Sequence, residues 1–578
     1  MKSILAIDCG SATTTAALIE QIGRDEYRLQ ATGQAPSTYT PPWNDVTWGV
    51  QEAIRHIEKE VGRAILSSSG WPVTPQNGQQ GVDAFLAVSS AGPPLRVVIA
   101  GLIQEFSLAS AQRAATTTYT LIKNVIALDA DSTARHNSPE AWIQAIQADE
   151  PDVILLVGGT DGGARLPVIE MSQVISMAVH ALQYKGKPYV LYAGNAELRS
   201  QMADILGPVT ALKSVNNVRP ILGIEDLTTV QAELERLVHQ KMLQLPGFEN
   251  LDGWSQHPIT LAGKSFERLI AYLGQYNGLN VIGVDIGSRT TMAVAQTKKS
   301  LTTTIRSDAG VGYGLDTLLK AIPLENIHRW LPFELSPGEL YNRLLNKSLY
   351  PTTIPAGNED ILIEQAVAKE ALRLVVGQNQ AEDTENQWNL IVGAGRSLTG
   401  APHFGQAALI LLDSLEPRGV SSLVLDQNGV VNMLGAIAAI DSMAAVSVTN
   451  HDALLNLGAV IAPAGHTQMG KLALKLIINY SEDEIVEQEI LYGSIQLIPL
   501  AVGQKATLEI RPARHFDIGL GQPGRSAVAE IEGGVLGIIV DARGRPLRLS
   551  QNDAQRRDQL QQWLQALNIT HAATTPNH

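Results

Sequence analysis

Residues 4–14 read ILAIDCGSATT, and residues 281–291 repeat the same design as VIGVDIGSRTT. In each stretch, a run of apolar and β-branched residues predicts a buried strand that ends on Asp8 or Asp285. Gly-Ser and a pair of threonines then turn the chain into a second apolar segment. Since the motif Asp-x-Gly-Ser-x-Thr-Thr occurs at both places, we expect two strand hairpins of the same kind.

The residue types of these hairpins suit phosphate binding. Glycine leaves backbone N–H groups unobstructed, serine and threonine add hydroxyl donors, and a carboxylate can hold Mg²⁺ through its water ligands. A single cluster of this kind is also ordinary turn chemistry. Two copies, however, predict a clamp in which two like-built halves offer facing loops to one ligand.

Composition limits the classes of protein that fit. The 578 residues, 45% of them hydrophobic and 17% charged, provide material for several cores and about three or four domains. A formal net charge of −14 argues against a nucleic-acid or anionic-membrane partner. Cys9 is the single cysteine, which excludes an intrachain disulfide and a multi-cysteine metal site. Without an apolar run of about 18 residues or a secretory leader, we expect a cytoplasmic protein.

Two further glycine turns follow predicted buried strands. The strand 152–157 leads into Gly-Gly-Thr-Asp-Gly-Gly at 158–163, and the strand 390–392 leads into Gly-Ala-Gly at 393–395. The following stretches read as helices: 108–118, 168–182, 360–376, 432–439 and 553–567. The segment 432–439 has little side-chain bulk, so another helix can pack closely against it.

The predicted secondary structure changes after residue 450 from mixed helices and strands to strands. Alternating strand segments bounded by Gly and Pro predict a separate small β domain, either a barrel or a sandwich. These segments are 471–478, 494–500, 505–510, 527–532 and 535–540. A terminal helix and a loose tail complete the chain.

These motifs resemble the ATPase superfamily of actin, sugar kinases and Hsp70. More narrowly, they resemble the glutamate mutase accessory family known as MutL or GlmL, which is unrelated to the mismatch-repair protein of the same name. The resemblance covers roughly residues 1–450 and is carried by these strings: Ser89-Ser90-Ala91-Gly92 with Leu95-Arg96, the 158–163 turn, Tyr192-Ala193-Gly194-Asn195 and the Asp285 hairpin. The 158–163 string is its most specific part.

The resemblance implies an α/β fold with two duplicated actin-like, ribonuclease H-like halves around a nucleotide cleft, plus the small C-terminal β domain. The expected domains are 1–270 for the first half with insertions, 271–450 for the second half, 451–548 for the β domain, and 549–578 for the terminal helix and tail.

The resemblance also implies roles for individual residues. Asp8 and Asp285 would hold Mg²⁺ through water and, together with Asp161, are the candidate catalytic residues. Asp161 would orient water or Mg²⁺, or it would form an Asx turn that caps the following helix. The expected ligands of ATP are Gly10, Ser11, Thr13, Thr14, Gly287, Ser288, Arg289 and Thr290 at the phosphates, Gly393, Ala394 and Gly395 at adenosine, and Gly158, Gly159, Thr160, Gly162 and Gly163 lining the cleft. ATP and Mg²⁺ are the expected cofactors, without tightly bound cobalamin.

Three positions depart from the family pattern. Thr15 stands where members often carry Lys, and Arg289 and Met292 replace small and acidic residues of the second hairpin. Arg289 would either grip a phosphate bidentately or occupy the site and exclude nucleotide. The sequence therefore predicts binding of ATP but leaves its hydrolysis open.

We expect an ATP-dependent accessory protein that reactivates a coenzyme B12-dependent mutase of the glutamate mutase type, through nucleotide-driven cleft closure. Its partner would be a mutase subunit or another protein, with no nucleic acid or membrane. It would have at most weak ATPase activity and would not catalyse the mutase reaction. The alternatives are a small-molecule kinase of the same superfamily and a degenerate ATPase that acts as a scaffold.

Other polar residues predict no site. Four histidines in helical patterns lack a second ligand at metal spacing: His56, His180, His239 and His328. Glu364, Lys369 and Glu370 predict a solvated helix face.

Overall fold

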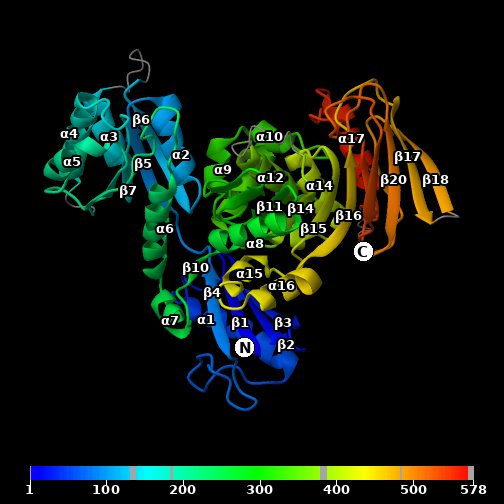
Figure 1. The fold of residues 1–578 in the computed structure, drawn as a ribbon, viewed down its shortest axis with the longest axis horizontal. Helices are drawn as coiled ribbons and strands as arrows, with labels where there is room; N and C mark the ends of the chain where they lie inside the picture. Colours follow the sequence, from blue (N-terminus) through cyan, green and yellow to red (C-terminus); the bar gives the residue numbers. More distant parts are fainter. Residues whose placement is uncertain (1, 130–137, 183–185, 378–386, 482–483, 570–578) are drawn as a thin grey trace. The chain divides into compact units, whose positions relative to one another are not determined.

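The computed structural model describes residues 2–129, 138–182, 186–377, 387–481 and 484–569 (Figure 1). The chain packs into two compact units. Unit 1 contains Met1–Ala91, Pro246–Thr303 and Asp308–His578, and unit 2 contains Gly92–Leu245 and Thr304–Ser307. Both units combine helices and strands, so the predicted mixed α/β class is confirmed.

The first sheet of unit 1 carries the Asp8 hairpin, in the strand order β10-β4-β1-β2-β3. Its strands are β1 (Ser3–Cys9), β2 (Thr13–Gln21), β3 (Tyr27–Pro36), β4 (Ala84–Ser89) and β10 (Thr260–Leu261). β1 is antiparallel to β2 and parallel to β4, with Asp8 opposite Thr15 and Val88. Ile4 and Ile7 are inaccessible to solvent, as expected of a central strand. β1 therefore delivers Asp8 from the buried centre of the sheet.

The second sheet of unit 1 carries the Asp285 hairpin, in the order β13-β12-β11-β14-β15-β16-β22-β19. Its strands are β11 (Val281–Ile286), β12 (Thr291–Gln296), β13 (Leu301–Arg306), β14 (Leu390–Ala394), β15 (Gly419–Leu425), β16 (Leu455–Ala462), β19 (Ile495–Ile498) and β22 (Ile538–Asp541). β11 is antiparallel to β12 and parallel to β14, which is the relation of β1 to β2 and β4. Both copies of the motif thus form the predicted strand hairpin.

A third, four-stranded sheet has the order β18-β17-β20-β21, with antiparallel neighbours. It consists of β17 (Leu472–Ser481), β18 (Glu484–Leu491), β20 (Lys505–Pro512) and β21 (Ala527–Glu532). The structure differs here from a self-contained β domain, because β19 and β22 join the eight-stranded sheet. Ile539 packs with the helices of unit 1, whereas Ile538 and Val540 pack against the four-stranded sheet. β22 is therefore buried on both faces: it is a strand of the eight-stranded sheet, and one of its faces packs against the four-stranded sheet.

The helices of unit 1 are α1 (Val46–Val61), α7 (Phe248–Trp254), α8 (Ala262–Asn277), α9 (Leu315–Ala321), α10 (Leu324–His328), α11 (Pro337–Leu349), α12 (Asn358–Val376), α13 (Arg396–Thr399), α14 (Phe404–Leu415), α15 (Val431–Ile437), α16 (Ser442–Val448), the π-helix η3 (Thr449–Ala453) and α17 (Asp553–Ala566). The predicted helices at 360–376, 432–439 and 553–567 appear as α12, α15 and α17. α15 packs on α8, where a Cβ at Gly435 would collide with the backbone oxygen of Ser265. This confirms the expected close packing; most of the predicted tail, 570–578, lies outside the described residues.

Unit 2 is built on a five-stranded, all-parallel sheet in the order β6-β5-β7-β8-β9. Its elements are β5 (Leu95–Gly101), η1 (Gln104–Leu108), α2 (Ala109–Ala115), β6 (Thr120–Ala127), α3 (Pro139–Asp149), β7 (Val153–Leu156), α4 (Leu166–Ala181), β8 (Tyr189–Tyr192), η2 (Ala196–Leu198), α5 (Arg199–Leu206), β9 (Leu212–Ser214) and α6 (Thr228–Leu243). The predicted helices at 108–118 and 168–182 appear as α2 and α4. Unit 2 has its own core, in which Ile154 and Leu156 of β7 pack with Val168 and Ile175 of α4.

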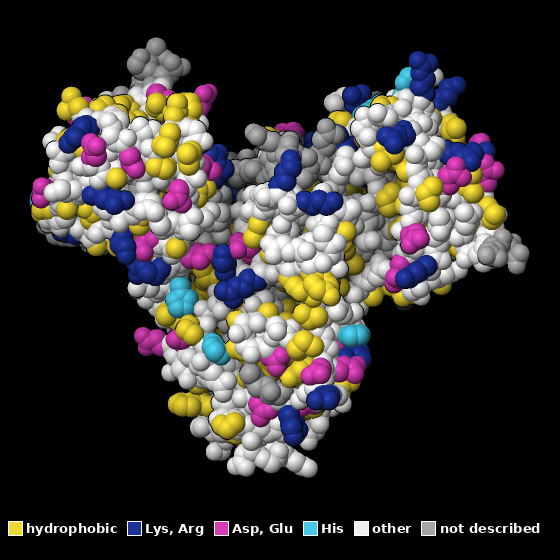
Figure 2. Space-filling model, viewed as in Figure 1, with side chains coloured by type: hydrophobic (Ala, Val, Ile, Leu, Met, Phe, Trp, Pro, Cys, Tyr) yellow, Lys and Arg dark blue, Asp and Glu magenta, His cyan; other side chains and the backbone are white. Residues whose placement is uncertain are grey.

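On the face that Figure 2 shows, basic and acidic side chains are interspersed over the described residues. Among these residues, no helix combines the length and the apolar character needed to cross a membrane.

Candidate functional site

The first hairpin turns tightly after Asp8. The Gly10 N–H donates to the carbonyl of Thr13 at 3.0 Å, and a Cβ at Gly10 would press on that carbonyl. The Ser11 hydroxyl donates to a backbone carbonyl at 3.3 Å. The hydroxyl of Thr14 is buried and shares a hydrogen bond of 3.1 Å with Ser37. Of the predicted phosphate ligands in this hairpin, Thr14 therefore faces the protein interior.

The second hairpin has the same turn and an additional wrap of chain around it. The Gly287 N–H donates to the carbonyl of Thr290 at 2.9 Å. The Ser288 carbonyl accepts from the N–H of Gly312 at 2.8 Å, and its hydroxyl accepts from the N–H of Tyr313 at 3.2 Å. The predicted turns are thus present in both hairpins, and backbone bonds hold the second one.

Arg289 projects from this second turn. Its guanidinium carbon lies 5.0 Å from the centre of the Tyr313 ring, a cation–π contact. Its Nε is inaccessible to solvent, and no described residue accepts a hydrogen bond from it. The side chain is therefore held beside the hairpin with one donor unused.

The two hairpins meet at one amide. Nδ2 of Asn432, on α15, lies 3.2 Å from Oδ2 of Asp8 and 3.0 Å from Oδ2 of Asp285. Oδ1 of Asp8 and Oδ1 of Asn432 are both inaccessible to solvent and have no partner in the part of the chain that the structure describes. The structure thus brings the two predicted carboxylates together and adds a residue for which the sequence suggested no role.

Burial perturbs both carboxyl groups. Desolvation raises the pKa of Asp8 to about 7; the bond from Asn432 opposes the shift, and the charge of Asp285 adds to it. Desolvation also raises the pKa of Asp285, again against the bond from Asn432. Two carboxylates that share one neutral donor therefore favour a proton or a cation between them.

Asp426 fixes the position of Asn432. It follows β15, and its carboxylate accepts from the N–H groups of Val430 at 3.0 Å and Val431 at 3.1 Å, where α15 begins. Burial raises the pKa of Asp426 to about 7, while these backbone bonds lower it. The sequence contains a signal for this residue: Asp426 directly follows the apolar strand β15, much as Asp8 and Asp285 stand next to the last residue of the apolar strands β1 and β11.

The Gly393–Gly395 turn lies against the second hairpin. A Cβ at Gly395, whose φ is +94°, would come within 2.6 Å of Oδ1 of Asp285. A Cβ at Gly393 would press on Leu398 and Leu411 at 3.0 Å, and Ala394 is buried. Gly395 therefore permits the approach to Asp285, whereas Gly393 serves packing against leucines.

The glycine turn at 158–163 belongs to unit 2 and is braced within it. Oδ1 of Asp161 accepts from the N–H of Ala196 and from Nδ2 of Asn217, both at 2.9 Å. Asp161 therefore binds the chain after β8 instead of capping α4, whose N-cap is Arg165. Three of its glycines have positive φ: Gly158 (135°), Gly159 (69°) and Gly162 (75°). A role of this turn at the nucleotide stays a prediction.

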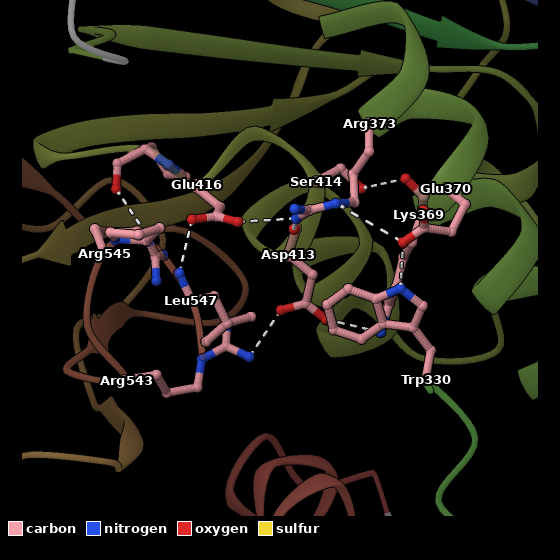
Figure 3. A network of polar contacts seen from close by, with 12 residues as sticks. Trp330, Lys369, Glu370, Arg373, Asp413, Ser414, Glu416, Arg543, Arg545 and Leu547 are labelled. Carbon is pink, nitrogen blue, oxygen red and sulfur yellow. Dashed lines mark hydrogen bonds and ion pairs between the residues drawn. The ribbon is translucent and has the colours of Figure 1, made fainter. Parts of the chain in front are cut away.

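The expected solvated face of α12 is wrong for two of its three residues (Figure 3). Lys369 and Glu370 are only 8% and 4% exposed. Nζ of Lys369 lies 2.7 Å from Oδ2 of Asp413, and Oε1 of Glu370 accepts from Nε1 of Trp330 at 2.7 Å. Glu364 remains partly exposed. The periodicity of α12 could not show this, because the partners come from other elements.

The network continues into the chain after β22. Arg543 forms ion pairs with Asp413 at 2.7 Å and Asp541 at 2.8 Å, and Arg545 reaches Asp541 at 2.6 Å. The guanidinium of Arg543 also lies 4.6 Å from the Trp563 ring of α17. Although burial alone would raise the pKa of Asp541, the two arginines hold it well below its usual range. This cluster binds α12, α14, β22 and α17 together.

The residues at the meeting of the hairpins fit Mg²⁺ held with phosphate. Mg²⁺ typically takes one or two carboxylates and completes its shell with water and phosphate oxygens. Asp8 and Asp285 supply two carboxylates, one of them with an unpartnered oxygen. Within the described residues, no group of three or more His, Cys, Asp or Glu side chains is placed to hold a metal by itself. The site therefore suits a cation that arrives with a phosphate ligand.

Comparison with known proteins agrees with the sequence resemblance. A family model described as "MutL protein" matches residues 4–453. "Protein MutL" of Clostridium tetanomorphum is 24% identical over 307 residues, which are 50% of this chain and 63% of that protein. The alignment thus spans less than two thirds of the relative.

Two solved structures are similar at low levels. The nucleotide-free acetone carboxylase covers 84% of this chain and 80% of its own, with 11% identity and a TM-score of 0.33. The nucleotide-free diol dehydratase-reactivating factor covers 76% and 100%, with 11% identity and a TM-score of 0.31. TM-scores of this size do not establish a shared fold.

Proposed function

This chain belongs to the MutL family of glutamate mutase accessory proteins, and on that premise we propose that it binds Mg-ATP between its two hairpins and uses the bound nucleotide to reactivate a B12-dependent mutase. The observation that carries the proposal is the meeting of Asp8 and Asp285 at Asn432. Two copies of one motif, 277 positions apart in the sequence, thereby contribute to the same place. A clamp of two hairpins requires this arrangement.

The phosphates would bind to the hairpin turns. Gly10 and Gly287 use their N–H groups to close the turns, so we assign the phosphate oxygens to the backbone N–H groups of 11–13 and 288–290. Asp8 and Asp285 would hold Mg²⁺ through water, and the cation would neutralise charge on the β- and γ-phosphates. Gly395 would bring the adenosine turn close to the same cation site.

Weak hydrolysis is compatible with these residues. A carboxylate with a pKa near the working pH can accept a proton from an attacking water, and burial gives Asp8 such a pKa. Bound Mg²⁺ would lower that pKa, so Asp8 would orient water more than deprotonate it. We propose slow turnover that resets the protein after each reactivation cycle.

Nucleotide would act on the partner through the two halves that carry the hairpins. We propose the divisions 1–270 and 271–450 for these halves, with unit 2 as an insertion in the first. A ligand held by both hairpins stabilises the conformation in which they are close. If the mutase binds one of these conformations better, its affinity depends on the bound nucleotide. By reciprocity, the mutase changes the affinity for nucleotide by the same factor.

The proposal is tested by reactivation of a mutase. Glutamate mutase inactivated by turnover would be incubated with free cobalamin coenzyme, this protein and Mg-ATP, and mutase activity would be followed. We expect recovery with Mg-ATP, little recovery without nucleotide, and loss of recovery in Asp285→Asn.

Asp316→Asn is the matched control, because Asp316 is exposed on α9 and forms a surface ion pair with Lys320 at 3.7 Å. Recovery that is independent of nucleotide would contradict the proposal. Transfer of the γ-phosphate to a small acceptor in the same assay would favour the kinase alternative.

A further inference from the structure

Asn432 has an unusual position for a residue without an assigned role. Its Nδ2 contacts two carboxylates that come from two different sheets. Its Oδ1 is inaccessible to solvent and has no partner among the described residues, and the same holds for Oδ1 of Asp8. A buried amide oxygen without a donor is costly, so its persistence needs an explanation.

The surroundings of Asn432 hold its backbone in place. Asp426 fixes the start of α15 through bonds to Val430 and Val431. Met433 and Leu434 on the same helix are inaccessible to solvent. The backbone of Asn432 is therefore anchored, and its terminal amide is the part that can turn about its last side-chain torsion.

The two ends of the amide suit two different occupants. Ionised carboxylates accept hydrogen bonds and do not donate them, so in the cation-free protein with both groups ionised the amide nitrogen faces Asp8 and Asp285. An amide oxygen in that place would meet two oxygens of like partial charge. A divalent cation, or the water molecules it carries, brings ionised carboxylate oxygens and an amide oxygen to one point.

We propose that Asn432 exchanges with a divalent cation between the hairpins: its amide nitrogen bridges Asp8 and Asp285 when no cation is bound, and its amide oxygen turns toward the cation when one is. Asn432 is then a positioning residue that links cation occupancy to α15. The inference rests on the proposed nucleotide site for its setting, but it concerns the cation and can fail or hold separately.

The test is binding of Mn²⁺, alone and with ADP, measured by electron paramagnetic resonance as the loss of the free-ion signal. We expect Asn432→Ala to weaken Mn²⁺ binding about 10- to 100-fold, the usual effect of losing a group that supports a metal ligand. We expect Asn432→Asp to keep the affinity or increase it, because an oxygen is retained.

Thermal unfolding separates this role from a purely structural one. In EDTA, Asn432→Asp should have a lower Tm than the wild type because three carboxylates then face one another, and Mn²⁺ should restore it. The matched control is Asn428→Ala, which removes an amide that donates to the Asp452 carbonyl at 3.0 Å just before α15. Wild-type Mn²⁺ affinity in Asn432→Ala, equal losses in Asn432→Ala and Asn428→Ala, or no Mn²⁺ uptake by the wild type would overturn the inference.

The result is distinguishable from failure of the proposed function. Mn²⁺ uptake that depends on Asn432 in a protein that binds no ATP would sustain the cation role and remove the nucleotide role. ATP binding together with a Mn²⁺ affinity that does not change on substitution of Asn432 would sustain the nucleotide role and remove the cation role of Asn432.

Discussion

The amide of Asn432 serves two carboxylates at once, which is why a short strand motif becomes a candidate site. Alone, Asp8 and Asp285 would be two buried like charges, a costly arrangement in a low-dielectric surrounding. One neutral donor reduces that cost without removing it, as the raised pKa values of both groups indicate. The negative charge that Asn432 leaves uncompensated favours binding of a cation between Asp8 and Asp285.

Arg289 offers a prediction for a single side chain. Because its guanidinium is held over Tyr313 with Nε unused, we expect it to bind a phosphate of the nucleotide. Arg289→Ala should weaken Mg-ATP binding about tenfold or more, since a charge-assisted hydrogen bond contributes ~1.5–3 kcal/mol. Calorimetric titration measures the change.

Tyr313→Phe is the control for this prediction, because it keeps the aromatic ring beneath the guanidinium. Its ATP affinity should match the wild type. Tighter binding in Arg289→Ala would instead mean that Arg289 occupies the site and keeps nucleotide out.

The sequence predicted the paired carboxylates because their signal is local: an apolar strand, an Asp and a glycine turn. It gave Asn432 only a packing role on α15, because hydrogen bonds to Asp8 and Asp285 span 424 and 147 positions of the chain. Asp426 carried the same strand-and-Asp signal in weaker form, without the following Gly-Ser-x-Thr-Thr. Local sequence patterns thus indicate candidate site residues, whereas contacts between distant parts of the chain decide their hydrogen-bond partners.

The elements around α12 show the same limit. The charges of Lys369 and Glu370 predicted a solvated face, yet Asp413 of α14 pairs with Lys369, and Trp330 donates to Glu370. Asp413 in turn pairs with Arg543 of the chain after β22. Replacing such a pair on one side only leaves an unpaired buried charge, which typically costs ~3–5 kcal/mol. The C-terminal β22 and α17 are therefore integral to the packing of unit 1.

This ionic cluster predicts the acid sensitivity of unit 1. The arginines hold the pKa of Asp541 below its unfolded value, so its stabilisation is fully present above about pH 4 and is lost as pH falls through the unfolded and then the folded pKa. Each carboxylate of this kind takes up one proton on unfolding. The free energy of unfolding should therefore fall by about 1.4 kcal/mol per pH unit for that group in this range. Urea unfolding at several pH values between 5 and 2.5 measures the slope.

Asp541→Asn should lower stability at pH 7 and show a smaller acid slope than the wild type. The surface variant Asp316→Asn should retain the wild-type slope. An Asp541→Asn slope equal to that of the wild type would mean that the cluster does not contribute to acid unfolding.

For the whole molecule, the family resemblance predicted the α/β class, and residue patterns predicted the five helices α2, α4, α12, α15 and α17. The matched family range 4–453 agrees with the extent of the sequence resemblance. The separate packing of 92–245 as unit 2 was not foreseen, because strands and glycine turns look alike whichever sheet they join. The pairing of β22 with β16 was missed for the same reason. Sheet membership depends on partners distant in sequence.

The central claim, that both hairpins bind one nucleotide, is tested most directly by calorimetric titration of Mg-ATP into the wild type, Asp8→Asn, Asp285→Asn and the double variant. We expect micromolar binding by the wild type and a loss of about tenfold or more in each single variant. The double variant should lose less than the sum of the two free-energy changes, because residues that hold one ligand couple. Additive losses, an effect confined to one hairpin, or no binding by the folded wild type would contradict the account.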